Sequence, residues 1–262
     1  MTAAVENPSA EPAASRESID KSNARVQRMF GQIASRYDLL NHVLSLNVDR
    51  YWRWRTVRRV PPVGEGPILD VCTGTGDLAI AYAKAGVKAA RRVGGGAKPP
   101  AVVGADFCRE MLDVAERKRA KSTAADLLTF VEADAQKLPF DDGRFQIVSV
   151  AFGLRNVFDT DAGLREMVRV LRPGGRLAVL EFSMPTWGPF ERLYRWYFRR
   201  VLPKVGERLA RNDNEAYAYL PATVAEFPSG EALAARMQAA GLASVEFYPM
   251  TLGIATLYVG VK

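Results

Sequence analysis

The 262-residue chain has little of the two residue types that most often carry metal or nucleophilic chemistry, since it holds two cysteines, Cys72 and Cys108, and one histidine, His42. A zinc site needs about four such ligands, so no metal site is expected. A Ser-His-Asp site would have to use His42, which falls in a helical pattern away from any serine turn. The two cysteines lie on different predicted elements and no signal peptide is evident. We therefore expect reduced thiols, no structural disulfide and a cytoplasmic location.

Long apolar runs are also missing. No stretch approaches the ~18 apolar residues needed to cross a bilayer, so we expect a protein that is soluble or peripheral to a membrane. Residues 1–21 are rich in Ala, Glu, Pro and Ser, which predicts a disordered tail. Residues 22–262 are long enough to bury one large core and are expected to form a single domain.

Negative charge is scarcer than positive charge: 29 Asp and Glu stand against 36 Lys and Arg, for a net charge of +7. Basic residues alternate with aromatic ones at 50–59 (RYWRWRTVRR) and 192–200 (RLYRWYFRR). Such stretches can lie on an anionic membrane or bind nucleic acid. They are equally typical of amphipathic helices with solvated basic faces, and at this point all three interpretations stay open.

Residues 68–77 (ILDVCTGTGD) are the most informative segment, because an apolar strand runs directly into a Gly-x-Gly turn. Gly74 and Gly76 allow positive φ and a close backbone approach to a ligand, and the following helix directs free N–H groups to the same place. A plain turn, a dinucleotide site and an S-adenosylmethionine site all fit this pattern. A dinucleotide site expects a third glycine at the helix entry, where this chain has Leu78.

Acidic residues end three successive predicted strands. Asp70 lies at the end of the first strand, Asp106 ends the second and Asp134 follows the third. The Gly- and Pro-rich segment 91–100 is interpreted as a loop insertion that delays Asp106. Three carboxylates along one edge of a parallel sheet suit a nucleoside with a cationic amino-acid tail better than a pyrophosphate.

The remaining patterns alternate between strand and helix. Strands are expected at 68–71, 101–106, 127–133, 145–151, 176–182, 244–250 and 255–261, and helices at 26–33, 37–60, 161–171 and 232–240, the last with Ser229 as its N-cap. This order predicts an α/β fold with a doubly wound, mostly parallel, Rossmann-like sheet of seven strands. The segments 22–60 and 183–226 are expected to form a helical cover over the sheet edge, the second as an insertion after strand five.

Several motifs together resemble the demethylmenaquinone and polyprenyl-benzoquinol C-methyltransferases, which are class I S-adenosylmethionine-dependent methyltransferases of quinone biosynthesis. These motifs are the Gly-rich turn, 134–140 (DAQKLPF), 152–156 (FGLRN), 171–175 (LRPGG) and 180–183 (LEFS). Upstream, 37–41 (YDLLN) and 45–52 (SLNVDRYW) resemble the N-terminal signature of that family. The similarity runs from about residue 26 to the end of the chain.

The resemblance implies S-adenosylmethionine as the methyl donor. Gly74, Thr75 and Gly76 would hold its methionine and ribose parts, with Asp70 beneath the amino group. Asp106 would accept from the ribose hydroxyls, and Asp134 with Ala135 would contact the adenine. The family often has serine where this chain has Ala151 and aspartate where it has Gln146. We therefore expect a backbone contact at Ala151.

Methylation of a ring carbon requires a quinol that has lost a hydroxyl proton and lies in line with the sulfonium methyl. A nearby sulfonium and an arginine favour that loss. Arg155 and Asn156 are the predicted residues that orient and stabilise the phenolate, with Tyr37 and Asp38 contributing from the cover, Asp38 as a proton acceptor. Each also has a structural interpretation: an acid partner for Arg155, a core position for Tyr37 and a helix cap for Asp38. His42 is expected to be structural.

The predicted substrate is a prenylated quinol. Demethylmenaquinol is favoured over a polyprenyl-methoxy-benzoquinol by Asp49-Arg50 in the N-terminal signature. Because such a substrate lives in the bilayer, the basic aromatic stretches would dock the protein and the 183–226 cover would open a slot for the tail. A nucleic-acid methyltransferase and a non-catalytic S-adenosylmethionine-binding protein are the alternatives. The chain lacks the Asn-Pro-Pro-Tyr motif and the paired catalytic cysteines of nucleic-acid enzymes, so no nucleic-acid partner is expected.

Overall fold

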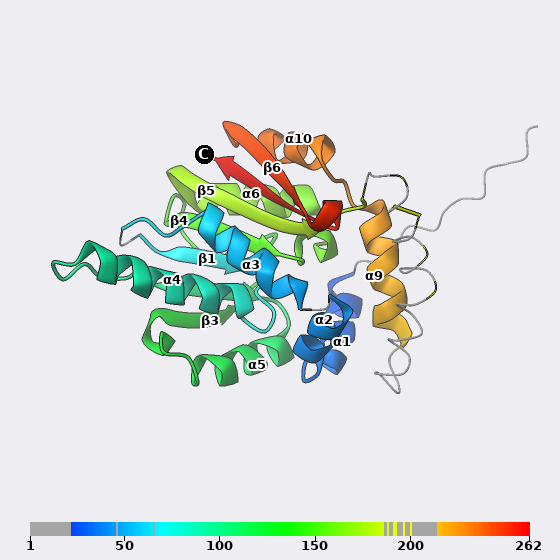
Figure 1. The fold of residues 1–262 in the computed structure, drawn as a ribbon, viewed down its shortest axis with the longest axis horizontal. Coiled ribbons are helices and arrows are strands. Elements are labelled where there is room, and N and C mark those ends of the chain that lie inside the picture. The colour runs from blue at the N-terminus through cyan, green and yellow to red at the C-terminus, as the bar shows by residue number, and fades with distance from the viewer. Residues whose placement is uncertain are drawn as a thin grey trace, which may run out of the picture.

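The computed structural model describes residues 22–45, 47–64, 66–185 and 214–262, and also residues 188, 191, 192, 196 and 200. Helices and strands alternate along most of this length (Figure 1). In chain order they are α1 (Asn23–Ile33), α2 (Tyr37–Leu44), α3 (Val48–Arg59), β1 (Ile68–Val71), α4 (Asp77–Val93), β2 (Val102–Asp106), α5 (Arg109–Arg119), η1 (Ala125–Leu127), β3 (Leu128–Glu132), β4 (Phe145–Ala151), η2 (Leu154–Asn156), α6 (Thr160–Val170), β5 (Leu171–Phe182), α9 (Asn214–Glu226), α10 (Glu231–Ala239), β6 (Ser244–Met250), η4 (Thr251–Gly253) and β7 (Ala255–Val261).

The described strands form one seven-stranded sheet in the order β3-β2-β1-β4-β5-β7-β6. Strands β1 to β5 are parallel, and β7 runs antiparallel to its neighbours β5 and β6. The strand order reverses between β1 and β4, which is where doubly wound folds bind ligands. The predicted fold class is confirmed, and β4, β6 and β7 have the predicted bounds.

Helices cover both faces of the sheet because successive strand residues point to opposite sides. Helices α3 and α4 pack on the face that presents Ile68 and Ile147. Helices α6 and α10 pack on the opposite face, which presents Leu69 and Val148. Two-sided burial explains why β1 and β4 are apolar along nearly their whole length.

Some predicted boundaries are wrong. The helix expected over 37–60 is two helices, because Asn47 adopts φ 63° in the left-handed region and interrupts the helical backbone. Residues 91–93, expected in a loop, complete α4, which ends where Gly94 takes φ 70° and ψ −161°. The N-cap of α10 is Gly230, with φ 60°, and not Ser229.

Helices α1, α2 and α9 lie together at one end of the molecule (Figure 1). Val26 and Met29 of α1 pack against Tyr219 of α9 in a small apolar cluster. The predicted tail 1–21 lies outside the described residues, as does most of the predicted insertion 183–226 before α9. The grouping of residues 22–262 into a single domain stays a prediction.

No helix in the described ranges combines the length and apolar content needed to cross a membrane.

Candidate active site

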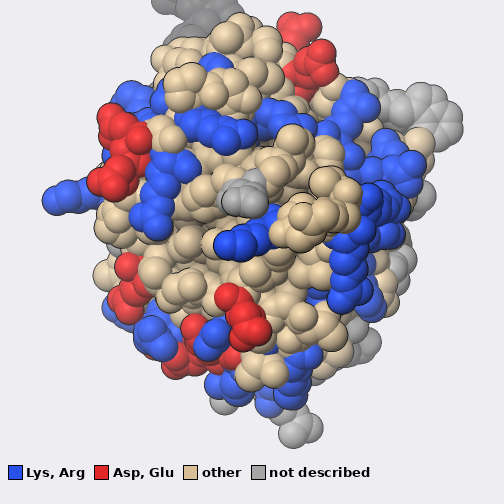
Figure 2. All heavy atoms as spheres, turned by 90° about the vertical axis from the view of Figure 1, so that its left-hand side faces the viewer, with Lys and Arg blue, Asp and Glu red and all other residues tan. Residues whose placement is uncertain are grey.

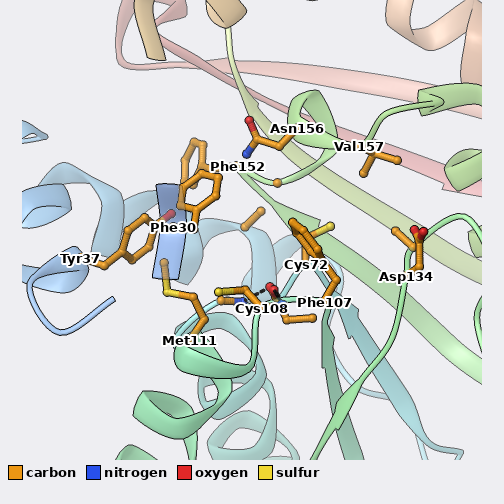
Figure 3. A pocket seen from close by; sticks show the side chains of 15 residues that line it. Phe30, Tyr37, Cys72, Phe107, Cys108, Met111, Asp134, Phe152, Asn156 and Val157 are labelled. Carbon is orange, nitrogen blue, oxygen red and sulfur yellow. Dashed lines mark hydrogen bonds between the residues drawn. The ribbon is translucent and has the colours of Figure 1, made fainter. Parts of the chain in front are cut away.

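A pocket opens where the strand order reverses, at the carboxyl ends of β1, β2, β3 and β4 (Figure 3). It encloses about 610 Å³ of space, a volume that includes open solvent at its mouth. Its lining residues are Phe30, Tyr37, Cys72, Gly74, Asp106, Phe107, Cys108, Met111, Asp134, Ala135, Ala151, Phe152, Gly153, Asn156 and Val157. The charged residues of this lining are two carboxylates, which favours a cationic ligand.

The Gly-rich turn forms one wall of the pocket. Gly74 has φ 54°, and an added Cβ there would meet nothing within 4 Å, so the backbone borders open space. Gly76 has φ 82° and begins α4, but a Cβ there would come within 2.8 Å of the Phe130 ring. Gly74 therefore lets a ligand approach the backbone, whereas Gly76 allows the turn to pack on the sheet. Cys72 has φ 51° at the start of the same turn.

Asp106 links the turn to the end of β2. Its carboxylate accepts hydrogen bonds from the backbone N–H of Gly74 at 2.8 Å and from that of Cys108 at 2.9 Å. Burial raises the pKa of Asp106 to about 6, although these N–H groups oppose the shift. An incoming cation or hydroxyl donor would favour the charged carboxylate.

Asp70 does not line the pocket and lies beneath the turn. It accepts hydrogen bonds at 2.7 Å from the hydroxyls of both Thr73 and Ser149. Burial raises the pKa of Asp70 to about 6, and the nearby Asp106 charge adds to the shift. Two buried carboxyl groups with raised pKa values near one pocket are typical of a functional site.

The other residues predicted to bind the methyl donor divide into two groups. Asp134, Ala135 and Ala151 line the pocket at the ends of β3 and β4. Thr75 is absent from the lining and donates its hydroxyl hydrogen bond to Asp38 at 2.6 Å.

The N-terminal helices and η2 supply the rest of the lining. Tyr37 and Phe30 lie on the side of the pocket opposite Asp134, and their rings meet edge to face at 6.0 Å (Figure 3). Burial raises the pKa of Tyr37, so its hydroxyl stays protonated near neutrality. Asn156 lines the pocket with a buried carboxamide oxygen that has no hydrogen-bond partner among the described residues. A buried oxygen without a partner favours a hydrogen-bond donor from a ligand.

Arg155 lies behind this wall rather than in it. Its side chain is 6% exposed, and its Nη1 donates to Glu181 Oε2 at 3.1 Å and to the Phe152 carbonyl. The guanidinium also lies 5.3 Å from the centre of the Phe182 ring. The acid partner that the sequence left as an alternative is thus Glu181, and the Nε of Arg155 remains without a partner in the described structure.

A network of charges fastens the helical cover to the turn. Asp38 on α2 accepts hydrogen bonds from Thr75 and, at 2.8 Å, from the ammonium of Lys118 on α5. Lys118 also pairs with Asp77 at the start of α4. The carboxylate Oδ2 of Asp77 lies 3.1 Å from Nη2 of Arg53 on α3.

The network continues through Asp49, which pairs with Arg53 and, at 2.9 Å, with His42. Burial would raise the pKa of Asp49, but the Ser45 hydroxyl and the Arg53 and His42 side chains lower it. His42 is thus part of this network, and its structural role stays a prediction.

Sequence reasoning missed three kinds of residue. Lys118 and Glu181 act through partners distant in the chain, although Glu181 falls within the LEFS motif. The apolar lining from Phe107 to Met111 looks like ordinary core in the sequence. Cys72 and Cys108 both line the pocket as free thiols. Burial raises the pKa of both thiols, so they remain neutral.

The strand order, the Gly-rich turn after β1 and the acids that end or follow β2 and β3 define a class I S-adenosylmethionine-dependent methyltransferase. The pocket suits that molecule, since Gly74 borders open space and the two charged residues of the lining are carboxylates, which complement a ligand of positive charge. The chain belongs to the ubiE/COQ5 methyltransferase family, whose model matches residues 18–262.

Curated relatives agree over most of the chain. The Thermus thermophilus demethylmenaquinone methyltransferase is 47% identical over 232 residues, which cover 88% of this chain and 99% of the relative. The ubiquinone/menaquinone biosynthesis C-methyltransferase UbiE of Geobacter sp. (strain M21) is 42% identical over 247 residues, covering 93% and 99% of the two chains.

Solved structures share the fold at low sequence identity. A Thermotoga maritima structure described as a SAM-dependent methyltransferase, possible histamine N-methyltransferase, has a TM-score of 0.61 at 17% identity, covering 90% of this chain and 99% of that one. A phosphoethanolamine N-methyltransferase 2 from Haemonchus contortus in complex with S-adenosyl-L-methionine has a TM-score of 0.55 at 16% identity, covering 80% and 52%.

Proposed function

We propose that this methyltransferase transfers the methyl group of S-adenosylmethionine to a ring carbon of a prenylated quinol, with demethylmenaquinol as the preferred acceptor. The observation that carries this proposal is a single pocket that joins the two halves of the reaction. One wall has the Gly-rich turn and two carboxylates, and the other has Tyr37, Phe30 and the unpartnered oxygen of Asn156.

The sheet side holds the donor. Gly74 and Asp106 contact its methionine and ribose parts, Asp134 and Ala135 border the adenine, and Ala151 contributes a backbone contact. Asp70 supports the turn from below through Thr73, while Thr75 and Gly76 fix its shape. When bound, S-adenosylmethionine supplies an electrophilic methyl group.

The cover side orients the acceptor. Asn156 accepts a hydrogen bond from one quinol hydroxyl, and Tyr37, which stays protonated, donates one. Arg155 holds the 152–156 loop through the Phe152 carbonyl and adds positive charge that favours a phenolate. Since Glu181 offsets part of that charge, positioning is the larger part of the Arg155 role.

Asp38 acts as a positioning residue in this proposal. Thr75 and Lys118 engage its two oxygens, so the carboxylate links the helix that carries Tyr37 to the donor turn. The proton of the quinol leaves to solvent or to a group outside the described residues.

Relatives named for both quinone types support the acceptor class. The names include demethylmenaquinone methyltransferase in Bacteroides fragilis, at 38% identity, and ubiquinone/menaquinone C-methyltransferase in Geobacter. A polyprenyl-methoxy-benzoquinol is therefore the second candidate. The protein acts in the cytoplasm at the membrane surface, and no nucleic-acid partner is proposed.

The test combines purified protein, S-adenosylmethionine and a short-chain demethylmenaquinol or benzoquinol. We expect a product heavier by one methyl group, with the naphthoquinol preferred and the new methyl on a ring carbon by NMR. Replacing Asn156 by Ala should lower kcat/KM for the quinol by about tenfold, the effect of losing one buried hydrogen bond. The exposed Gln238→Ala on α10 serves as the control. No methylated product with either quinol would refute the proposal.

We also propose that the reaction needs no metal. Within the described ranges, no group of three or more His, Cys, Asp or Glu residues could hold an ion. Activity should survive excess EDTA and subsequent gel filtration. A loss restored by Mg²⁺ or Zn²⁺ would contradict this.

A further inference from the structure

Helices α3 and α4 pack in one layer over the same face of the sheet, and the exposed charged side chains of both are all basic. These are Arg50, Arg55, Arg58 and Arg59 on α3 and Lys84, Lys88, Arg91 and Arg92 on α4. None of these eight forms an ion pair with a carboxylate of the described residues. We call this surface the α3–α4 face.

The α3–α4 face also exposes aromatic rings. Trp52, Thr56 and Val57 form the buried side of α3, while Tyr51 and Trp54 are 47% and 51% exposed on its outer side. The two exposed rings lie 5.9 Å apart, and the Arg58 guanidinium lies 5.3 Å from Trp54. Exposed Trp and Tyr among arginines are typical of helices that lie at a membrane interface.

A strained apolar tip lies beside α3. Thr251, Leu252 and Gly253 have φ values of 50°, 56° and 89°, so Leu252 adopts a conformation that is costly for leucine. Leu252 is nevertheless 62% exposed. The indole N–H of Trp52 donates to Thr251 Oγ1 at 2.8 Å, which fixes the tip next to the helix.

Figure 2 shows Lys and Arg gathering along its right-hand edge, which is the side that faces the viewer in Figure 1. Among the described residues, acidic groups near the α3–α4 face are few. Asp49 is buried, Asp77 is paired with Lys118, and Glu246 lies at the margin beside Tyr248, whose ring Arg59 covers at 3.8 Å. Cations that border exposed aromatic and aliphatic groups complement an anionic bilayer, whereas nucleic acid would leave Leu252 without an apolar partner.

We propose that the α3–α4 face docks the protein on an anionic phospholipid bilayer, with Tyr51, Trp54 and Leu252 entering the headgroup region. The catalytic use of this docking rests on the proposed function. On the inner side of α3, Trp52 lies 5.7 Å from the ring of Phe152, which lines the pocket, and 6.0 Å from Phe182. Docking thus brings an aromatic cluster next to both the bilayer and the pocket, where an apolar tail would pass.

Sedimentation with phosphatidylglycerol/phosphatidylcholine vesicles tests the docking. The full-length protein should bind vesicles rich in phosphatidylglycerol and leave neutral ones, with binding weakened by salt. The double variant R55E/R58E should lose at least about tenfold in apparent affinity, since each Arg near an anionic surface contributes about fivefold. The matched control is R117E/R165E, which has the same net charge but places its changes on α5 and α6; it should bind like wild type. Equal loss in both variants would overturn the proposal.

Leu252→Gly separates insertion from folding, because glycine relieves the positive φ while removing the apolar tip. We expect an unchanged or higher Tm together with weaker vesicle binding. Brominated lipid should quench the fluorescence of wild type more than that of Trp54→Phe. Unchanged binding by Leu252→Gly, no difference in quenching, or binding to single-stranded RNA but not to vesicles would each overturn the assignment.

Two substrates distinguish this proposal from the proposed function. R55E/R58E should methylate a water-soluble short-chain quinol at the wild-type rate and lose activity on a long-chain quinol in anionic vesicles. A wild-type protein that docks but methylates neither quinol would refute only the proposed function.

Discussion

On the sheet side of the pocket, Asp106 and Asp70 accept hydrogen bonds from backbone N–H groups and hydroxyls of the Gly-rich turn, of β4 and of the start of α5. On the cover side, the contacts are ion pairs between helices. The Lys118 and Asp38 side chains that form one of them are 26% and 32% exposed. Buried hydrogen bonds to the backbone are short-range and insensitive to salt, whereas half-exposed ion pairs are weak and screened. The side that binds the methyl donor is therefore rigid, whereas the helical cover is held by contacts that can rearrange.

This difference matches what each side has to bind. The donor is always the same small cation, so its site can be preformed by backbone. In the proposed function, a quinol with a long apolar tail enters past the helices, which requires contacts that can open at low cost. Variants on the two sides should consequently fail in different ways.

The largest effect should come from Gly76→Ala on the sheet side. The left-handed φ and the clash with Phe130 together should cost about 3 kcal/mol of unfolding free energy. Gly143→Ala is the matched control, because its φ is 65° but the nearest atom to an added Cβ lies 3.8 Å away; it should cost about 1 kcal/mol. Urea denaturation measures both. Equal losses in the two variants would mean that the Gly-rich turn rearranges to accept the added methyl group. The sheet side would then be no more rigid than the cover.

Asp106→Asn should weaken S-adenosylmethionine binding by about a hundredfold. The variant keeps the shape of the side chain but loses the charge that attracts the cation and strengthens the hydrogen bonds to ribose hydroxyls. Isothermal titration calorimetry measures the affinity. The exposed Asp113→Asn on α5 carries the same chemical change and should bind like wild type. Wild-type affinity in Asp106→Asn would remove this carboxylate from the donor site.

The same contrast decides what the sequence could predict. The strands, the Gly-rich turn and the position of Asp106 follow from local patterns, since apolar runs, glycine and strand-end acids lie close together in the chain. The cover does not follow in this way. Lys118 meets Asp38 across 80 positions, and no local pattern indicates that pairing.

Wrong boundaries have a similar cause. Asn47 in the left-handed region ends a helical pattern that the sequence continues, and Gly230 replaces Ser229 as the N-cap because the backbone there takes positive φ. The partner of Arg155 required the strand pairing of β4 with β5, which brings Glu181 beside the end of β4. The predicted roles of the site residues stay predictions.

The pH dependence of stability and of S-adenosylmethionine binding tests the sheet side through a smaller effect. Folding raises the pKa of Asp106 and Asp70 to about 6, so the folded state holds these protons more tightly than the unfolded chain. Unfolding free energy should therefore fall as pH rises from about 4 to about 6 and level off above. Donor binding has the opposite sign, because the cation favours the charged carboxylates.

Affinity for S-adenosylmethionine should thus drop below pH 6, by up to about tenfold per pH unit for each proton involved. Calorimetry between about pH 5 and pH 8 measures this, with proton release detected by comparing buffers. Asp106→Asn should flatten the profile. A flat profile in the wild type would mean that S-adenosylmethionine does not contact Asp106.

The smallest effect should come from Lys118→Met on the cover side. The substitution keeps the apolar stem and leaves Asp38 and Asp77 without their shared cation. Because the pairs are partly exposed, unfolding free energy should fall by about 1 kcal/mol. The KM for the quinol should rise several-fold while the dissociation constant of S-adenosylmethionine stays within about twofold, since the turn keeps its own hydrogen bonds. The neighbouring exposed Arg117→Met controls for the lost charge.

At about 0.5 M salt the wild type should approach the variant, because screening weakens the same ion pairs. If the affinity for S-adenosylmethionine fell as far as the affinity for the quinol, the cover and the turn would behave as one unit. The distinction between a rigid sheet side and an adjustable cover would then be wrong.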